Sequence, residues 1–243
     1  MPMNKKYARR PRKSRKSGGV AKRAVTNYKK NKLIKLIKSV SLKNCETKDT
    51  HIISENAQLF HNVPYVVSTL LYTEQGINDN ETGTVQTQKR IGDEVIGRGI
   101  SLKLWFANKL DRPDVTYKLI VFRYKSNTGL NTSLDPYMSQ GTTNFLIRDI
   151  NTDKFKIVKV KNFRISTSAQ RITAQDTFNG AEGHRAMTIW IPLKRAIKYE
   201  DGSSTPKDFD YAFTVVAYDS FGTLTTDNIA SFAINRKFYF KDP

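Results

Sequence analysis

From residue 46 onward, apolar and polar residues alternate with a period of two over several separate stretches. In "EVIGRGISLKLWFAN", which covers residues 94–108, every second position from Ile100 to Phe106 is apolar, and Lys103 and Trp105 fall between them. Such alternation is typical of a β-strand with one buried face. The sequence therefore predicts a strand whose even-numbered residues from Ile100 to Phe106 line a core.

Similar stretches recur along the rest of the chain. They cover residues 116–125, 155–166, 186–200, 211–221 and 229–240, with a weaker one at about 47–63 and a short one at 144–149. Several of the polar connections between them are longer than ordinary hairpin loops, which favours strands that cross between two sheets. We therefore expect an all-β fold, an eight-stranded jelly-roll β-sandwich.

The pattern upstream of residue 46 is different. In "NKLIKLIKSVSLK", residues 31–43, four apolar residues follow one another at spacings of three and four, with lysines between them: Leu33, Leu36, Ile37 and Val40. A helix would place these four on one stripe and would place Lys35 and Lys38 on a basic face. The stretch is also rich in β-branched residues, so the pattern leaves a helix and an extended segment both open.

Charge divides the chain at the same place. Residues 1–45 hold 16 lysines and arginines and no aspartate or glutamate, whereas the whole chain has 41 basic and 22 acidic residues. The remainder, from Glu46 onward, carries only +3 of the net charge of +19. We therefore divide the chain into a basic N-terminal arm, residues 1–45, and a jelly-roll domain, residues 46–243.

A run of like charges repels itself and buries little surface, so we expect residues 1 to about 30 to be disordered in the free protein. Dense lysine and arginine neutralise phosphates without reading bases, which predicts strong, nonspecific and salt-sensitive binding of nucleic acid. A solvated tail or a membrane-surface segment is the alternative, but the first thirty residues lack bulky apolar partners for an interfacial helix. Tyr7 and Tyr28 are candidates for stacking on unpaired bases.

The candidate phosphate contacts are the basic side chains of the arm. They are Arg9, Arg10, Arg12, Lys13, Arg15, Lys16, Lys22, Arg23, Lys29, Lys30, Lys32, Lys35 and Lys38. The run "RRPRKSRK" also has the composition of a nuclear localisation signal.

The usual signatures of catalysis and metal binding are missing from the sequence. His51, His61 and His184 do not have the spacing of metal ligands, and no His-x-His motif of a DNA-nicking site occurs. The glycines of "GDEVIGRG" lack the Lys-Ser/Thr of a phosphate-binding loop, and "Pro113-Asp114" is not followed by the acid-x-Lys of a restriction-type nuclease. We expect no enzymatic activity, no metal and no cofactor.

Neighbouring acids do not change this expectation, because Asp93 and Glu94 would face opposite sides of a strand. Cys45 is the only cysteine, so no disulfide within the chain is possible. The start "MPMNKKYARR" has no apolar segment of a signal peptide, and no apolar stretch is long enough to span a membrane. We expect an intracellular, soluble chain without membrane insertion.

Taken together, the arm "RRPRKSRKSGG" and the stretches "RIGDEVIGRGISLKLWFAN", "YKLIVFRYKSN", "DKFKIVKVKNFRIS" and "NRKFYFKDP" carry a resemblance to a family. The chain resembles the capsid proteins of circular Rep-encoding single-stranded DNA viruses, the circovirus-like group with the satellite-virus type of jelly roll. The resemblance extends over nearly the whole chain.

The resemblance implies a T=1 shell of sixty copies, with the arms pointing inward around a single-stranded DNA genome and the long loops outside. RNA as the packaged nucleic acid stays open. About sixty arms of about sixteen charges would supply on the order of a thousand positive charges, comparable to a genome of about one to two thousand nucleotides. The implied partners are other copies of the chain, the genome and a host nuclear import receptor, and the implied locations are the virion and the host nucleus.

A second interpretation uses the same arm without a shell. It is a nucleic-acid-binding module such as a viral nuclear shuttle or a chromatin-associated protein. The size of the particle that the protein forms would separate the two interpretations.

Overall fold

The computed structural model describes residues 28–34, 36–37, 40, 45–76, 80–82, 85–128, 130, 135–139, 143–166, 170–171, 178–179, 183–220 and 223–242. The chain comprises two units, residues 1–44 and residues 45–243. The prediction of a disordered arm over residues 1 to about 30 falls mostly on residues 1–27, which lie outside the described residues.

The described part of the first unit is helical. Residues 28–34, 36–37 and 40 have helical geometry, so Tyr28, Lys29 and Lys30 already belong to a helix. We call this segment the N-terminal helix. Of the two conformations that the sequence left open for residues 31–43, the structure therefore has the helix over the described positions up to Val40.

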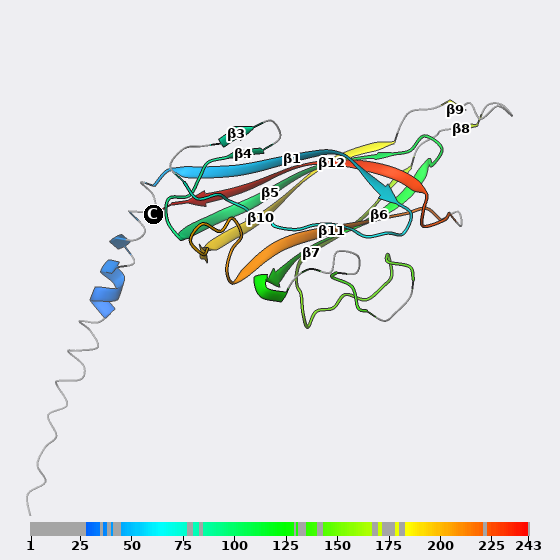
Figure 1. Cartoon of the computed structure of the whole chain (residues 1–243). Helices are drawn as coiled ribbons and strands as arrows, with labels where there is room; N and C mark the ends of the chain where they lie inside the picture. The colour runs from blue at the N-terminus through cyan, green and yellow to red at the C-terminus, as the bar shows by residue number, and fades with distance from the viewer. Residues whose placement is uncertain are drawn as a thin grey trace, which may run out of the picture. The chain divides into compact units, whose positions relative to one another are not determined.

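The second unit is built from strands and one short 3-10 helix in its described residues (Figure 1). The elements are β1 (Thr47–Phe60), β2 (Tyr65–Val67), β3 (Asn80–Thr82), β4 (Val85–Thr87), β5 (Glu94–Asn108), β6 (Asp114–Lys125), η1 (Ser126–Thr128), β7 (Lys156–Ser166), β8 (Gln170–Arg171), β9 (Phe178–Asn179), β10 (His184–Lys198), β11 (Phe209–Tyr218) and β12 (Asn228–Lys241).

Two antiparallel sheets form the sandwich. The first, sheet 1, has the order β10-β5-β12-β1, extended by β4 and β3 beyond β1, and the second, sheet 2, has the order β2-β11-β6-β7. Short strands β8 and β9 pair only with each other. In Figure 1, β1, β12, β5 and β10 form one layer, and β11, β6 and β7 form the other.

The pairing of the eight sandwich strands is nested, which makes the fold a jelly roll. The first strand pairs with the last, β1 with β12, and the second with the last but one, β2 with β11. Inside these pairs lie β5 with β10 and β6 with β7. Among these eight strands, β6 and β7 alone follow each other within one sheet, so every other connection between them crosses between the sheets, as the long loops predicted.

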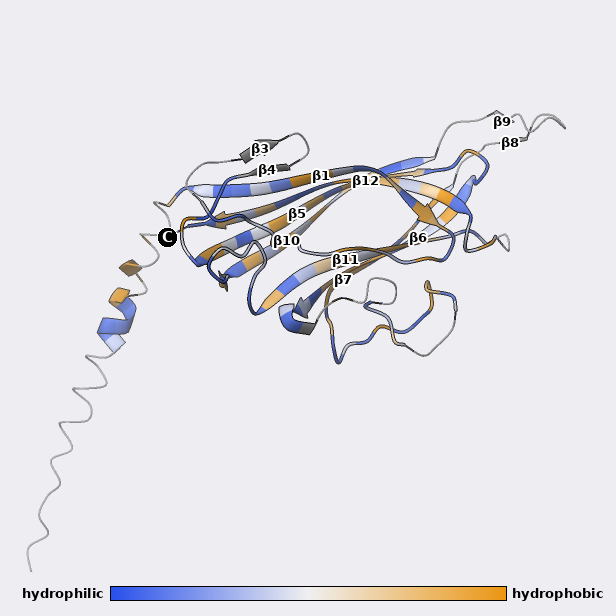
Figure 2. Cartoon of the chain, viewed as in Figure 1, coloured by the Kyte–Doolittle hydropathy of each residue, from blue (hydrophilic) through white to orange (hydrophobic). Residues whose placement is uncertain are grey.

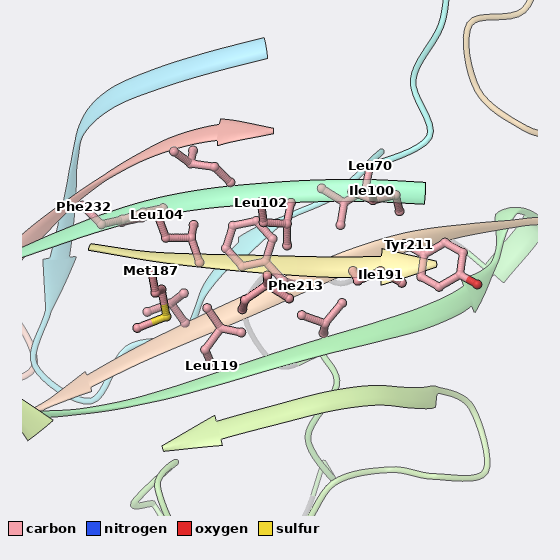
Figure 3. Close-up of a cluster of buried hydrophobic side chains, with 14 of the residues drawn as sticks. Leu70, Ile100, Leu102, Leu104, Leu119, Met187, Ile191, Tyr211, Phe213 and Phe232 are labelled. Atoms are coloured by element: carbon pink, nitrogen blue, oxygen red, sulfur yellow. The ribbon is translucent and has the colours of Figure 1, made fainter. Parts of the chain in front are cut away.

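The core lies between the two sheets. From β5, Ile100, Leu102, Leu104 and Phe106 are all buried, which confirms the predicted face of this strand. Figure 3 shows side chains of β5 and β10 directed toward Leu119 of β6 and Phe213 of β11. The apolar residues recur along β5, β10 and β11 as orange segments in Figure 2.

One predicted strand is wrong. Residues 144–149 form turns, with backbone bonds from Ile147 and Arg148 back to the carbonyl of Asn144 (3.3 and 3.0 Å). The eighth strand of the sandwich is instead β2, a strand of three residues that is too short to show an alternating pattern.

The wrongly predicted segment covers the outer face of sheet 2. We call residues 135–139 and 143–155 the cover segment; Figure 1 shows it as the green loop below β7 and β11. Its Tyr137 and Phe155 are buried together with Phe122 of β6 and Val216 of β11 in a second apolar cluster. Of the apolar side chains that suggested a strand at 144–149, Phe145 and Leu146 therefore pack on a sheet rather than belong to one, and Ile147 is exposed.

Candidate nucleic-acid interface

The N-terminal helix carries three of the predicted phosphate contacts. Lys29, Lys30 and Lys32 lie on it with exposed side chains. The other predicted contacts lie outside the described residues: Arg9, Arg10, Arg12, Lys13, Arg15, Lys16, Lys22, Arg23, Lys35 and Lys38. The proposed stacking residue Tyr28 is exposed on the same helix, and Tyr7 lies outside the described residues.

A second candidate surface lies on the outer face of sheet 1, where both tryptophans of the chain are exposed. Trp105 on β5 is 43% exposed and Trp190 on β10 is 50% exposed. Trp105 lies opposite Ala186 of β10, and Trp190 lies opposite Ser101 of β5. The two tryptophans are thus four residues apart along neighbouring strands. Their rings lean away from each other, because that of Trp105 lies 6.1 Å from the ring of His184 and that of Trp190 lies over Gly99.

Small neighbours leave both rings room against the sheet. Trp105 has Ala186 on one side and Ala233 of β12 on the other. Trp190 lies against Gly99, where an added Cβ would be only 2.2 Å from the ring carbon Cζ2. Glycine at position 99 is therefore what allows the indole of Trp190 to lie close over β5.

A groove of about 410 Å³ runs beside Trp105. Its other lining residues include Lys103, Thr188 and Asn235, which form one row across β5, β10 and β12, and Ile53 of β1. The ammonium of Lys103 is exposed in the centre of this face, between the rows that hold the two tryptophans.

The charge and aromatic content of this face extend toward β12. The ring of Tyr239 lies 5.8 Å from that of Trp190, centroid to centroid. Lys237, in the same row as Trp190, forms an ion pair with Asp49 (3.5 Å). We call this surface, with Lys103, Trp105, Trp190, Lys237 and Tyr239, the tryptophan face.

The tryptophan face has the chemistry of a platform for unpaired bases. Indole rings stack on any base because every base has a π-face, and lysines among them neutralise the sugar-phosphate backbone. The alternation of residues 94–108 places Trp105 on the outward side of its strand, but it assigns no role to either tryptophan. A sequence signal for this surface did exist: a tryptophan occupies a solvent-facing position of an alternating strand in residues 94–108 and again in residues 186–200.

The histidines have structural partners. The Nδ1 atom of His61 accepts a hydrogen bond from the backbone N–H of Asp219 (3.2 Å), and burial lowers the pKa of His61. His51 lies 3.8 Å from the carboxylate of Asp49. Among the residues that the structure describes, no group of three or more His, Cys, Asp or Glu side chains could hold a metal ion.

The acidic and glycine-rich motif around residue 93 is a turn held by a buried arginine. Arg90 is fully buried, donates to the carbonyls of Ser203 (2.7 Å) and Gly92, and faces the ring of Tyr199 at 4.6 Å. Asp93 forms an ion pair with the same arginine (3.3 Å). The motif therefore joins loops at one end of the sandwich.

Asp114, which the sequence analysis considered as part of a nuclease motif, begins β6. Its carboxylate forms a bidentate ion pair with Arg164 of β7. Arg164 lies opposite Thr116 in the pairing of β6 with β7, two residues along β6 from Asp114. Such a pair on adjacent strands is a cross-strand contact of the sheet.

Comparison with known proteins gives this chain no family. No family model matches it, and no curated protein matches it. Among solved structures, a CocE/NonD family hydrolase from Staphylococcus aureus is similar at 10% sequence identity and a TM-score of 0.22, over 82% of this chain and 37% of the hydrolase chain. A likeness at this level carries no argument about fold or function. No helix in the described residues is long and apolar enough to cross a membrane.

Proposed function

We propose that this protein is the subunit of a small self-assembling shell that packages single-stranded nucleic acid, with DNA as the expected genome. The observation that carries the proposal is the joining of two parts in one chain: a jelly-roll sandwich, and a segment of 45 residues that holds 16 basic side chains and no acid. The sandwich supplies contacts between copies, and the arm condenses the packaged strand.

The tryptophan face gives the sandwich its own part in packaging. The arm binds phosphates wherever they are, whereas Trp105 and Trp190 bind unpaired bases and so favour a single strand over a duplex. Trp105 and Trp190, four residues apart along β5 and β10, offer two stacking points for a stretch of unpaired nucleotides laid along these strands.

Several apolar side chains on the body are available for contacts between copies. Val158 and Val160 are exposed on β7, which is the edge strand of sheet 2, and Ile147 and Met138 are exposed on the cover segment. Lysines alternate with the two valines and oppose unwanted pairing of this edge with other strands. Contacts between copies would then use side chains rather than the backbone of β7.

The assembly is tested by the size of the particle. Negative-stain microscopy and light scattering of the purified protein should show uniform hollow spheres without any partner protein. A single population of monomers or dimers over a range of salt and pH would instead favour a nuclear shuttle or chromatin-associated module, which uses the same arm without a shell.

Packaging is tested by removing residues 2–30. The sandwich should still fold and assemble, because the deleted residues belong to the other unit, but the particles should enclose little nucleic acid. The absorbance ratio at 260 and 280 nm measures this, and a salt titration of single-stranded DNA binding should show a flatter slope. The control replaces Lys156, Lys159 and Lys161 of β7 by glutamine. If this control loses nucleic acid and the deletion does not, the arm is not the packaging element.

A further inference from the structure

The N-terminal helix exposes a continuous apolar stripe. Leu33, Leu36, Ile37 and Val40 are between 51% and 61% exposed, and Ile34 beside them is 41% exposed. Their spacing of three and four residues places them on one side of the helix. Exposing five large aliphatic side chains on one face to water is unfavourable in free energy, and the neighbouring lysines do not remove this penalty.

The same segment is strongly cationic. Lys29, Lys30 and Lys32 are exposed on the helix, and the sequence adds Lys35 and Lys38 at positions that a regular helix turns away from the stripe. No acidic residue occurs before Glu46. A binding partner must therefore be anionic and must also offer an apolar medium for the stripe.

This pair of requirements separates the available partners. Single-stranded nucleic acid neutralises the lysines but leaves the branched aliphatic side chains in water. A second copy of the helix would cover the stripe but would bring two sets of lysines together, with like charges repelling. The interface of an anionic lipid bilayer satisfies the stripe and the lysines at once, because headgroup phosphates lie directly above an acyl layer.

We propose that the N-terminal helix binds the surface of anionic phospholipid bilayers. It lies in the plane of the interface, with the stripe of Leu33, Leu36 and Ile37 among the acyl chains and the lysines among the headgroups. It does not cross the bilayer, in keeping with the lack of any membrane-spanning helix in the described residues. This inference goes beyond the packaging role and does not depend on it.

The test is flotation of the full-length protein with lipid vesicles, under conditions in which light scattering shows dispersed subunits. Vesicles of phosphatidylcholine with phosphatidylserine should carry the protein upward, and vesicles of phosphatidylcholine alone should not. The variant Leu33→Ser/Leu36→Ser/Ile37→Ser keeps every charge but removes the stripe. Its partitioning into the anionic vesicles should fall at least roughly tenfold, since interfacial binding scales with buried apolar area.

Binding of single-stranded DNA by the same variants separates this inference from the packaging role. The triple serine variant should keep its DNA affinity within about twofold, because phosphate binding counts charges. The matched variant Lys29→Gln/Lys30→Gln/Lys32→Gln should weaken both DNA binding and flotation. The inference is overturned if the wild-type protein does not float with anionic vesicles, or if the triple serine variant floats as well as the wild type. A lysine variant that loses DNA binding but floats as well as the wild type would leave packaging supported and would overturn the placement of the lysines among the headgroups.

Discussion

The outer faces of the two sheets differ in whether another part of the chain covers them. On sheet 2 the cover segment closes the outer face, so that β6 and β11 are buried on both sides over most of their length. On sheet 1 the outer face is open and carries Trp105, Trp190 and a groove. An antiparallel sheet can leave one face in water, so the open face of sheet 1 needs no cover and stays accessible to another molecule.

The cover is held by polar contacts as well as by its apolar side chains. Arg148 donates to the carbonyls of Met138 (2.8 Å) and Ser139 (2.7 Å), which ties the two ends of the segment together. Lys118 of β6 reaches through to the carbonyl of Leu146 (2.7 Å), and burial lowers the pKa of this lysine. The outer face of sheet 1 has no such cover among the described residues: the small residues Ala186 and Ala233 flank Trp105, and a groove lies beside it.

The largest effect is expected for a charge on the inner side of the open sheet. Leu102→Asp places an unpaired carboxylate in a fully buried position and should abolish soluble folded protein. Lys103→Asp, one residue further on the outer side, should leave folding intact. Expression yield and circular dichroism of the two variants check this, and equal tolerance of both would show that the two faces of β5 are misassigned.

The next effect compares an aromatic residue of the cover with one of the open face. Phe155 packs edge-on against Phe122 at 5.2 Å, and Phe155→Ala should lower the free energy of unfolding by about 3 kcal/mol. Trp105→Ala removes a half-exposed ring and should cost about 1 kcal/mol or less. Urea denaturation of both variants measures the difference; similar losses would mean that the open face is as important for stability as the covered one.

Binding should show the opposite order. Trp105→Ala and Trp190→Ala should each weaken binding of single-stranded DNA by about tenfold, the equivalent of roughly 1.4 kcal/mol for a lost stacking contact. Phe at the same positions should restore most of the affinity, because it keeps a ring. Fluorescence anisotropy with a labelled oligonucleotide at fixed salt is the measurement, and Phe155→Ala serves as the control from the covered face.

A pH-dependent effect concerns an acid that β11 buries beside the loop at residues 68–71. The Asp210 carboxylate accepts from the backbone N–H groups of Leu71 (3.1 Å) and Tyr211 (2.6 Å), and burial raises its pKa to about 7 from 3.8. The folded protein thus binds a proton at Asp210 that the unfolded chain releases above pH 4. Stability from this proton is fully present below the unfolded pKa and is lost as the pH rises through 7.

Between about pH 4 and pH 7, this group should therefore lower the free energy of unfolding by up to about 1.4 kcal/mol per pH unit as the pH rises. Asp210→Asn cannot titrate and should flatten that part of the curve. Thermal melts of the two proteins across this range give the comparison. Parallel curves would show that Asp210 does not bind a proton in the folded state near neutral pH.

The alternation of residues 94–108 predicted β5 with its bounds and its buried face. In a strand with one buried face, every second side chain points into the core and is therefore apolar. The stretch at residues 116–125 predicted β6 as one more alternating strand, and only the structure shows that this strand is buried on both sides. The short strand β2 escaped prediction because three residues show no period, and residues 144–149 misled because apolar residues in a packed loop resemble those of a strand.

The sequence by itself determined where the charge lies, which stretches become long strands and, for β5, which side faces the core, because these depend on residues that are neighbours along the chain. Only the tertiary structure decided the nested pairing of β1 with β12 and β5 with β10, since strand pairing joins residues that are far apart in sequence. The same pairing brings Trp105 and Trp190 onto one open face. No local sequence pattern predicts that the two tryptophans lie near each other, because their proximity follows from the register of β5 against β10.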